Sequence, residues 1–274
     1  MLPKAWILSI GNEVVTGQII NTNGAWLAKR LTVLGFDVRR IIAVPDLEEE
    51  VVKVIKESIN ENIDVVVSTG GLGPTYDDRT SEFLAKALRR KLVINSDALK
   101  MIEEKYKSKG LSMTEHRVKM AMLPEGAKPI PNPVGTAPAI LVEVGKTIII
   151  ALPGVPREMK AIYEEYVEDI LKKRAPKVYR SEKWFKVVGI PESTIAPIID
   201  RVVKKYRTVY VKSHPRGEEL NNPIIHVYVV ASSLNDQREA AEIAEKVYKE
   251  LVEEFLKLKG KIEELEINSV KGGE

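Results

Sequence analysis

Apolar and polar positions follow two different periods along the first ninety residues of the chain. Short runs of apolar and β-branched residues, typical of buried strands, cover residues 5–10, 37–44 and 63–67. After each run, apolar positions recur every three or four residues, which predicts amphipathic helices over 22–34, 47–60 and 81–90. This strand–helix repeat predicts a parallel sheet with right-handed crossovers.

The pattern changes in the following eighty residues. The spacing predicts helices over 95–109 and 114–121, a hairpin with strands 140–144 and 147–152, and a helix over 157–173. Between them, the stretch from Leu123 to Ile140 is dense in Pro and Gly, and we expect it to be irregular. A loop of this length inside a compact domain is either functional or disordered.

A second, smaller domain is predicted beyond the boundary at Arg174-Ala175-Pro176. Its elements alternate in the order β-α-β-β-α, over residues 184–188, 192–206, 208–213, 224–231 and 235–258. The predicted organisation is therefore an α/β domain over 1–174, with a mostly parallel sheet, followed by a small α+β domain over 177–258. Residues 259–274 form a charged tail that we expect to fray.

Composition narrows the possible functions. The 274 residues carry 42 basic and 39 acidic side chains, a net charge of +3, which gives no reason to expect a nucleic-acid partner. With no cysteine and three histidines, thiolate chemistry is excluded and a histidine-rich zinc site is not expected. No signal peptide and no apolar run of about 20 residues is present, so a cytoplasmic protein without membrane contact is expected. Abundant Lys and Glu favour a thermophilic source.

The segment TGGLGPTYDD at residues 69–78 carries the strongest candidate chemistry. It follows a buried strand, and Gly70, Gly71 and Gly73 allow a sharp turn that brings backbone close to a ligand. Such a turn before a helix suits an anionic group, and the carboxylates of Asp77 and Asp78 could hold a divalent cation that a phosphate shares. A ligand-free turn explains the glycines alone equally well.

Other polar residues come directly after predicted strands. Gly11, Asn12 and Glu13 follow the first strand, and Asp46 follows the second. Because ligands bind off the carboxyl ends of strands in such sheets, these residues are expected to meet the 69–78 segment at one edge. Glu13 fits a metal ligand and a surface ion pair equally well. Asp46 fits an N-cap of the next helix, and either Asp77 or Asp78 could cap the helix near Thr80.

Two further loops could hold phosphate. Gly135 and Thr136, between prolines, suit a second anion cradle, although a rigid connection is the alternative. Pro153 and Gly154 precede a predicted helix N-terminus. The candidate ligand-binding residues are Gly11, Asn12, Thr69, Gly70, Gly71, Gly73, Thr75, Gly135, Thr136, Pro153 and Gly154. The candidate metal ligands are Asp78, Asp46, Glu13 and Asp77.

Four segments, in order and over about residues 4–173, together resemble one family. They are Gly11-Asn12-Glu13 with Gly17 and Asn21, TGGLGPTYDD, PNPVGTAPA at 131–139, and LPGVPREM at 152–159. They resemble the amino-terminal domain of the CinA competence/damage-inducible family, within the wider molybdopterin-binding superfamily that includes MogA and MoaB. The deamidase domain of full-length CinA has no counterpart in the sequence, so deamidase activity is not expected.

The resemblance implies a three-layer α/β/α fold for residues 1–174, a site and two alternative functions. The superfamily's two functional aspartates correspond to Asp46 and Asp78. In CinA-type proteins the implied reaction is metal-dependent hydrolysis of ADP-ribose to AMP and ribose phosphate. In MogA-type relatives the ligand is molybdopterin, which is adenylylated. Leu72, where adenylylating relatives have Thr, favours the CinA-type reading, and Ala139 departs from the glycine of many CinA sequences. The superfamily forms dimers or trimers, so a homo-oligomer is expected.

Overall fold

The computed structural model describes residues 2–206, 208–218, 221 and 223–265. These residues divide between two compact units, Met1–Pro176 and Lys177–Glu274. Within the described ranges, no helix combines the length and apolar character needed to cross a membrane.

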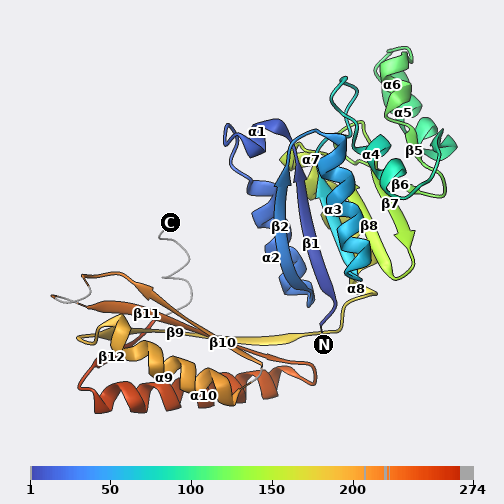
Figure 1. Cartoon of the computed structure of the whole chain (residues 1–274). Coiled ribbons are helices and arrows are strands. Elements are labelled where there is room, and N and C mark those ends of the chain that lie inside the picture. Colours follow the sequence, from blue (N-terminus) through green and yellow to red (C-terminus); the bar gives the residue numbers. More distant parts are fainter. Residues whose placement is uncertain (1, 207, 219–220, 222, 266–274) are drawn as a thin grey trace. The chain divides into compact units, whose positions relative to one another are not determined.

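The first unit is built on a six-stranded sheet in the order β2-β1-β3-β8-β7-β6 (Figure 1). The strands of this sheet are β1 (Lys4–Ile10), β2 (Asp37–Val44), β3 (Val65–Thr69), β6 (Lys128–Ile130), β7 (Ala139–Val144) and β8 (Thr147–Leu152). The neighbours β2, β1, β3 and β8 run parallel, whereas β7 and β6 are antiparallel. The predicted, mostly parallel sheet is confirmed.

Helices cover both faces of this sheet (Figure 1). They are α1 (Asn12–Val15), α2 (Thr22–Leu34), α3 (Glu48–Asn60), α4 (Thr80–Ala87), α5 (Ser96–Lys107), α6 (Glu115–Lys119), α7 (Pro156–Ile162) and α8 (Glu168–Lys172). Alternate residues of β1 point to opposite faces, as the two-residue period of a strand requires. Trp6 lies in one core with α3, α4 and α5, while Ile7 lies in the other with α2, α7 and α8.

Caps define where the helices begin and end. The Asn21 side chain accepts a hydrogen bond of 2.9 Å from the Gly24 N–H at the start of α2, which satisfies a backbone donor. Gly35 ends that helix with a φ of 103°. Asn95 caps α5 in the same way, accepting from Ala98 at 3.0 Å.

The Pro-rich stretch 123–140 is not wholly irregular, which corrects the prediction. It contributes to β5 (Met122–Pro124) and contains β6. The former pairs with the unpredicted β4 (Leu92–Ile94) in a two-stranded sheet. β6 is the edge strand of the large sheet, so a strand neighbours it on one side only. Proline has no N–H to donate, and such an edge strand tolerates it.

The predicted helix over 157–173 is interrupted. Between α7 and α8 the chain forms a π-helical segment, η1 (Tyr163–Val167). Met159, Tyr163, Val167 and Leu171 are all fully buried and follow one another at intervals of four residues. A regular α-helix has about 3.6 residues per turn, so side chains spaced by four residues move gradually around its axis. The wider turn of η1 compensates for this shift and keeps these side chains on one face.

The second unit is a four-stranded antiparallel sheet in the order β10-β11-β9-β12. Its elements are β9 (Tyr179–Val188), α9 (Glu192–Lys205), β10 (Val209–Pro215), β11 (Ile224–Ser233), α10 (Gln237–Lys257) and β12 (Lys261–Leu265). Phe185 and Phe255, both fully buried, lie in its core between the sheet and the helices.

The fourth strand of this unit corrects the expectation of a fraying tail from residue 259 onward. Ile262 of β12 lies opposite Val187 of β9 and packs against the core. Lys186 and Glu263, also opposite one another, form an ion pair of 3.0 Å. The strand was not predicted because most of its residues are charged, and the local pattern does not show that Ile262 packs against the core. Residues 266–274 lie outside the described part of the chain.

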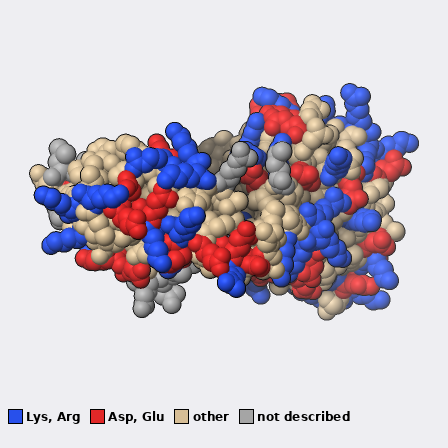
Figure 2. All heavy atoms as spheres, turned by 90° about the horizontal axis from the view of Figure 1, so that it is seen from below, with Lys and Arg blue, Asp and Glu red and all other residues tan. Residues whose placement is uncertain are grey.

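Charged side chains of both signs are interspersed on the face drawn in Figure 2. This arrangement agrees with the near balance of 42 basic and 39 acidic residues. Figure 2 draws one face of the molecule, so the expectation that the protein has no nucleic-acid partner remains a prediction.

Candidate functional site

At the carboxyl edge of the large sheet, the first residues of two loops donate backbone hydrogen bonds to the last residues of the neighbouring strands. The Gly11 N–H, after β1, donates to the Val44 carbonyl of β2 at 3.1 Å. The Gly70 N–H, after β3, donates to the Leu152 carbonyl of β8 at 3.0 Å. The parallel register of these strands brings together loops that are far apart in sequence.

The turn at Gly70-Gly71 requires glycine at both positions. Gly70 has a φ of 112°, and a Cβ there would lie 2.0 Å from the Ile10 carbonyl oxygen. Gly71 has a φ of 68°, and its Cβ would lie 2.2 Å from the Thr80 Oγ1. That buried hydroxyl donates to the Gly70 carbonyl at 2.8 Å. The β3–α4 connection is therefore packed tightly against the end of β1 at Ile10 and against the start of α4 at Thr80.

Asp78 organises the rest of this loop. Its Oδ2 accepts hydrogen bonds from the Thr75 N–H at 2.9 Å and the Thr75 hydroxyl at 2.6 Å. A Cβ at Gly73 would lie 2.5 Å from the same oxygen, so the glycine makes room for the carboxylate. Asp77 is exposed, and the Thr75 hydroxyl holds its pKa below the ordinary value. The N-cap of α4 is Arg79, with no side-chain cap, so neither aspartate caps this helix.

Asp46 faces the same edge from the β2–α3 connection. It does not cap α3, whose N-cap is Leu47 without a side-chain hydrogen bond. Instead, its Oδ2 accepts from the Asn12 N–H at 2.9 Å. Burial raises the pKa of Asp46, and the charges of Glu13, Asp77 and Asp78 raise it further, while the Asn12 hydrogen bond opposes them. These carboxylates are thus near enough to interact electrostatically.

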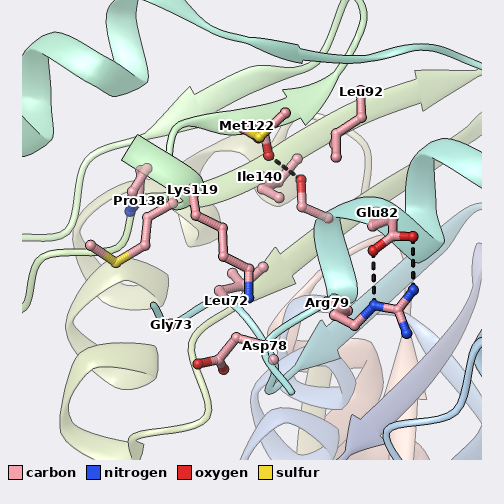
Figure 3. A pocket seen from close by; sticks show the side chains of 13 residues that line it. Leu72, Gly73, Asp78, Arg79, Glu82, Leu92, Lys119, Met122, Pro138 and Ile140 are labelled. Atoms are coloured by element: carbon pink, nitrogen blue, oxygen red, sulfur yellow. Dashed lines mark hydrogen bonds and ion pairs between the residues drawn. The ribbon is translucent and has the colours of Figure 1, made fainter. Parts of the chain in front are cut away.

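A pocket of about 170 Å³ lies against the 70–78 loop (Figure 3). Its walls include Leu72, Asp78 and, from α6, Lys119, whose ammonium contacts the Thr75 carbonyl. The apolar side chains of Met122 and Ile140 form the opposite wall in Figure 3. A pocket that combines apolar walls with a carboxylate and an ammonium suits a heterocycle with polar substituents.

Asn23 is a site residue that sequence reasoning missed. Its Nδ2 donates to the Thr69 hydroxyl at 3.1 Å and to the Gly154 carbonyl at 2.8 Å, while the Thr69 hydroxyl donates to the Pro153 carbonyl at 2.8 Å. A Cβ at Gly154 would lie 3.3 Å from the Gly70 Cα. The loops after β3 and β8 therefore touch, and a pocket of about 100 Å³ opens beside them toward Glu13.

The loop with Gly135 and Thr136 lies beside the first pocket. Pro138 lines that pocket and also a groove of about 390 Å³ that Thr136 and Asn132 border. Asn132 is 3% exposed and was not a candidate, because asparagine in a Pro-rich stretch is typical of turns. Of the residues proposed from the sequence, Gly71, Gly73 and Asp78 line the first pocket, Glu13, Thr69 and Gly154 line the second, and Thr136 borders the groove. They therefore border separate depressions rather than one enclosed cavity.

The candidate metal ligands are all carboxylates, which suits a hard cation such as Mg²⁺. Among the described residues, no group of three or more His, Cys, Asp or Glu side chains has the geometry to hold an ion. The mutual electrostatic influence of Asp46, Glu13, Asp77 and Asp78 is compatible with a cation between them. Metal binding therefore stays a prediction.

Replacing Asp46 with Asn is expected to stabilise the metal-free protein at neutral pH. Because the folded pKa of Asp46 is raised, its ionised form destabilises the fold as pH rises from the ordinary value of 3.8 through the folded value. The gain in unfolding free energy should vanish near pH 3, where the carboxyl is protonated in both states. Denaturant unfolding with a chelator across this range, with the exposed Asp200→Asn as control, measures it. An equal gain at pH 3 and pH 7 would contradict the electrostatic cause.

Comparisons with known proteins agree with this architecture. A family described as "Probable molybdopterin binding domain" matches residues 6–173. A protein from Pyrobaculum aerophilum is 52% identical over 255 residues, 93% of this chain and 95% of its own. A protein from Sulfolobus acidocaldarius is 46% identical over 261 residues, 95% of this chain and 98% of its own.

A solved structure is similar to part of the chain. It is described as the crystal structure of the protein CinA with unknown function from Thermoplasma acidophilum. The two chains are 43% identical, with a TM-score of 0.57, over 61% of this chain and 97% of that one. The chain therefore belongs to the probable molybdopterin binding domain family and is a CinA-like member of it.

Proposed function

We propose that this protein binds molybdopterin, or a closely related phosphorylated heterocycle, at the carboxyl edge of the large sheet, as part of molybdenum-cofactor metabolism. The observation that carries the proposal is the family match over residues 6–173, which spans every loop of the candidate site. The apolar wall formed by Met122 and Ile140 would receive the ring system, and the Gly71 and Gly73 backbone beside Lys119 would receive the phosphate.

Each side chain has a role in this proposal. Asp78 holds the 73–78 turn and presents its carboxylate to the pocket, while Lys119 adds a positive charge opposite an anionic ligand. Because no three described His, Cys, Asp or Glu side chains form a cation site by themselves, a divalent cation would need phosphate oxygens as well as Asp46 and Glu13. When bound, that cation would neutralise charge on the phosphate oxygens. Asn23 keeps the Thr69 and Gly154 loops together beneath the ligand.

The proposal is tested by the ligand that the protein carries. Protein expressed in a host that makes molybdopterin, and purified without prolonged dialysis, is expected to release a fluorescent pterin after denaturation and oxidation. The same protein from a host unable to make molybdopterin is the control. Absence of pterin from the first preparation, together with no thermal shift on adding molybdopterin, would reject the proposal.

Hydrolysis of ADP-ribose is the second candidate. Its support is the electrostatic influence of Asp77 and Asp78 on Asp46, because carboxylates that shared a divalent cation could orient water and neutralise a diphosphate. Incubation with ADP-ribose and Mg²⁺ or Mn²⁺ should then release AMP and ribose phosphate. Incubation with ATP and molybdopterin separates this reaction from adenylyl transfer, which would yield an adenylylated pterin instead.

A further inference from the structure

The loop from Pro131 to Pro138 contains a turn built around one buried side chain. The Asn132 Oδ1 accepts from the Val134 N–H at 3.2 Å and from the Gly135 N–H at 2.7 Å. Its Nδ2 donates to the Ala137 carbonyl at 3.0 Å. A single amide thus fixes both limbs of the loop that presents Gly135 and Thr136.

Two charged side chains from separate helices hold this turn from outside. Glu158 of α7 accepts from the Asn132 Nδ2 at 2.7 Å. Lys105 of α5 contacts the carbonyls of Asn132 and Gly135. Burial lowers the pKa of Lys105, and the charge of Glu158 opposes that effect. Both charges are therefore directed at one loop, although Lys105 and Glu158 are more than 50 residues apart in sequence.

Gly135 is required by this contact rather than by its backbone conformation. A Cβ there would lie 2.0 Å from the Glu158 Oε2 and 2.1 Å from its Cδ, and the three nearest atoms all belong to Glu158. The residue does not have a positive φ, so an alanine backbone is permitted. The glycine allows the carboxylate to press against the loop backbone.

We propose that Glu158 is a positioning residue that, with Lys105, latches Asn132 and so holds Thr136 in place toward the ligand. The latch is defined here as Lys105, Asn132 and Glu158. The ligand rests on the proposed function, whereas the holding of the loop does not. Thr136, Asn132 and Lys105 border the groove of about 390 Å³ beside α5, so the latch also fixes one wall of that groove.

Amide hydrogen exchange of residues 132–137 tests the latch without any ligand. Glu158→Ala should speed exchange of the Val134 and Gly135 amides by about tenfold, because Asn132 loses its acceptor. Glu158→Gln keeps an acceptor and should restore most of the protection. Glu164→Ala, an exposed site in the π-helical segment that follows, is the matched control. Unchanged exchange in Glu158→Ala would overturn the proposal.

A double-mutant cycle tests the contact with Gly135. Gly135→Ala alone should also speed exchange, because its methyl group displaces the carboxylate. In the Glu158→Ala background the same substitution should add little, because the obstructing atoms are gone. Equal effects in both backgrounds would show that Gly135 and Glu158 act independently, contrary to the latch.

Ligand affinity completes the test, with molybdopterin, ADP-ribose and ATP as probes in titration calorimetry. Glu158→Ala should lower the affinity for whichever probe the wild type binds by about tenfold, and Glu158→Gln should lower it by less. Faster exchange with unchanged affinity would overturn the link between the latch and the ligand. A wild type that binds none of the probes, together with faster exchange in Glu158→Ala, would contradict the proposed function alone.

Discussion

Replacing Gly70 with Ala is expected to lower the free energy of unfolding of the first unit by about 3–5 kcal/mol. Two penalties combine at this position. A φ of 112° is unfavourable for any residue with a Cβ, and the added atom would lie 2.0 Å from the backbone carbonyl of Ile10. Because backbone cannot rotate away as a side chain can, β1 and β3 would have to separate at their carboxyl ends.

Chemical denaturation of the purified variant measures this loss, with Gly145→Ala as the matched control. Gly145 also has a positive φ, 58°, but no atom lies within 4 Å of its added Cβ. The control should therefore lose only about 1–2 kcal/mol from backbone strain. Equal losses in the two variants would show that close approach to Ile10 does not determine the requirement for glycine.

The second large effect is expected at Asp78. Asp78→Asn should weaken ligand binding on the order of 100-fold while leaving the fold intact. The amide oxygen of asparagine can still accept from the Thr75 N–H, so the 73–78 turn is retained. What is lost is the charged acceptor that Asp78 offers in the pocket to N–H groups of a heterocycle. The affinity for molybdopterin, measured with Mg²⁺ present and again with a chelator, reports this change.

Two comparisons make the Asp78 experiment specific. Asp78→Ala removes the acceptor as well as the charge, so it should also loosen the turn and lower the melting temperature. Asp200→Asn removes an exposed carboxylate from α9 in the other unit and should change neither quantity. An Asp78→Asn protein that binds as tightly as wild type would remove this carboxylate from the ligand site.

Long periodic segments of the chain were predictable because one stretch of sequence carries the whole pattern. The buried runs of β1 and β3 and the amphipathic spacing of α3 are examples. The missed strands are short and depend on distant partners: β4 pairs with β5, and β12 pairs with β9, more than 70 residues earlier. Pro124 in β5 and the charged residues of β12 conceal the alternation that local patterns provide, and β4 is only three residues long.

In the candidate site, too, local sequence features were predictable and contacts between distant residues were not. The 69–78 segment stood out because its glycines and carboxylates are adjacent in sequence. Asn23 and Glu158 did not, because their partners lie 131 and 26 residues away, and each fits an ordinary role at a helix start. Asp46 was proposed, but its bond to the Asn12 amide required knowledge of which strands are neighbours.

The closure of the small sheet by β12 affects where the second unit can be cut. A fragment that stops at Leu258, where the helical pattern ends, would leave the backbone of β9 unpaired along one side. Exposed edges of this kind recruit strands from other molecules, so such a fragment would be prone to aggregation. A soluble fragment of the second unit should extend at least through Leu265.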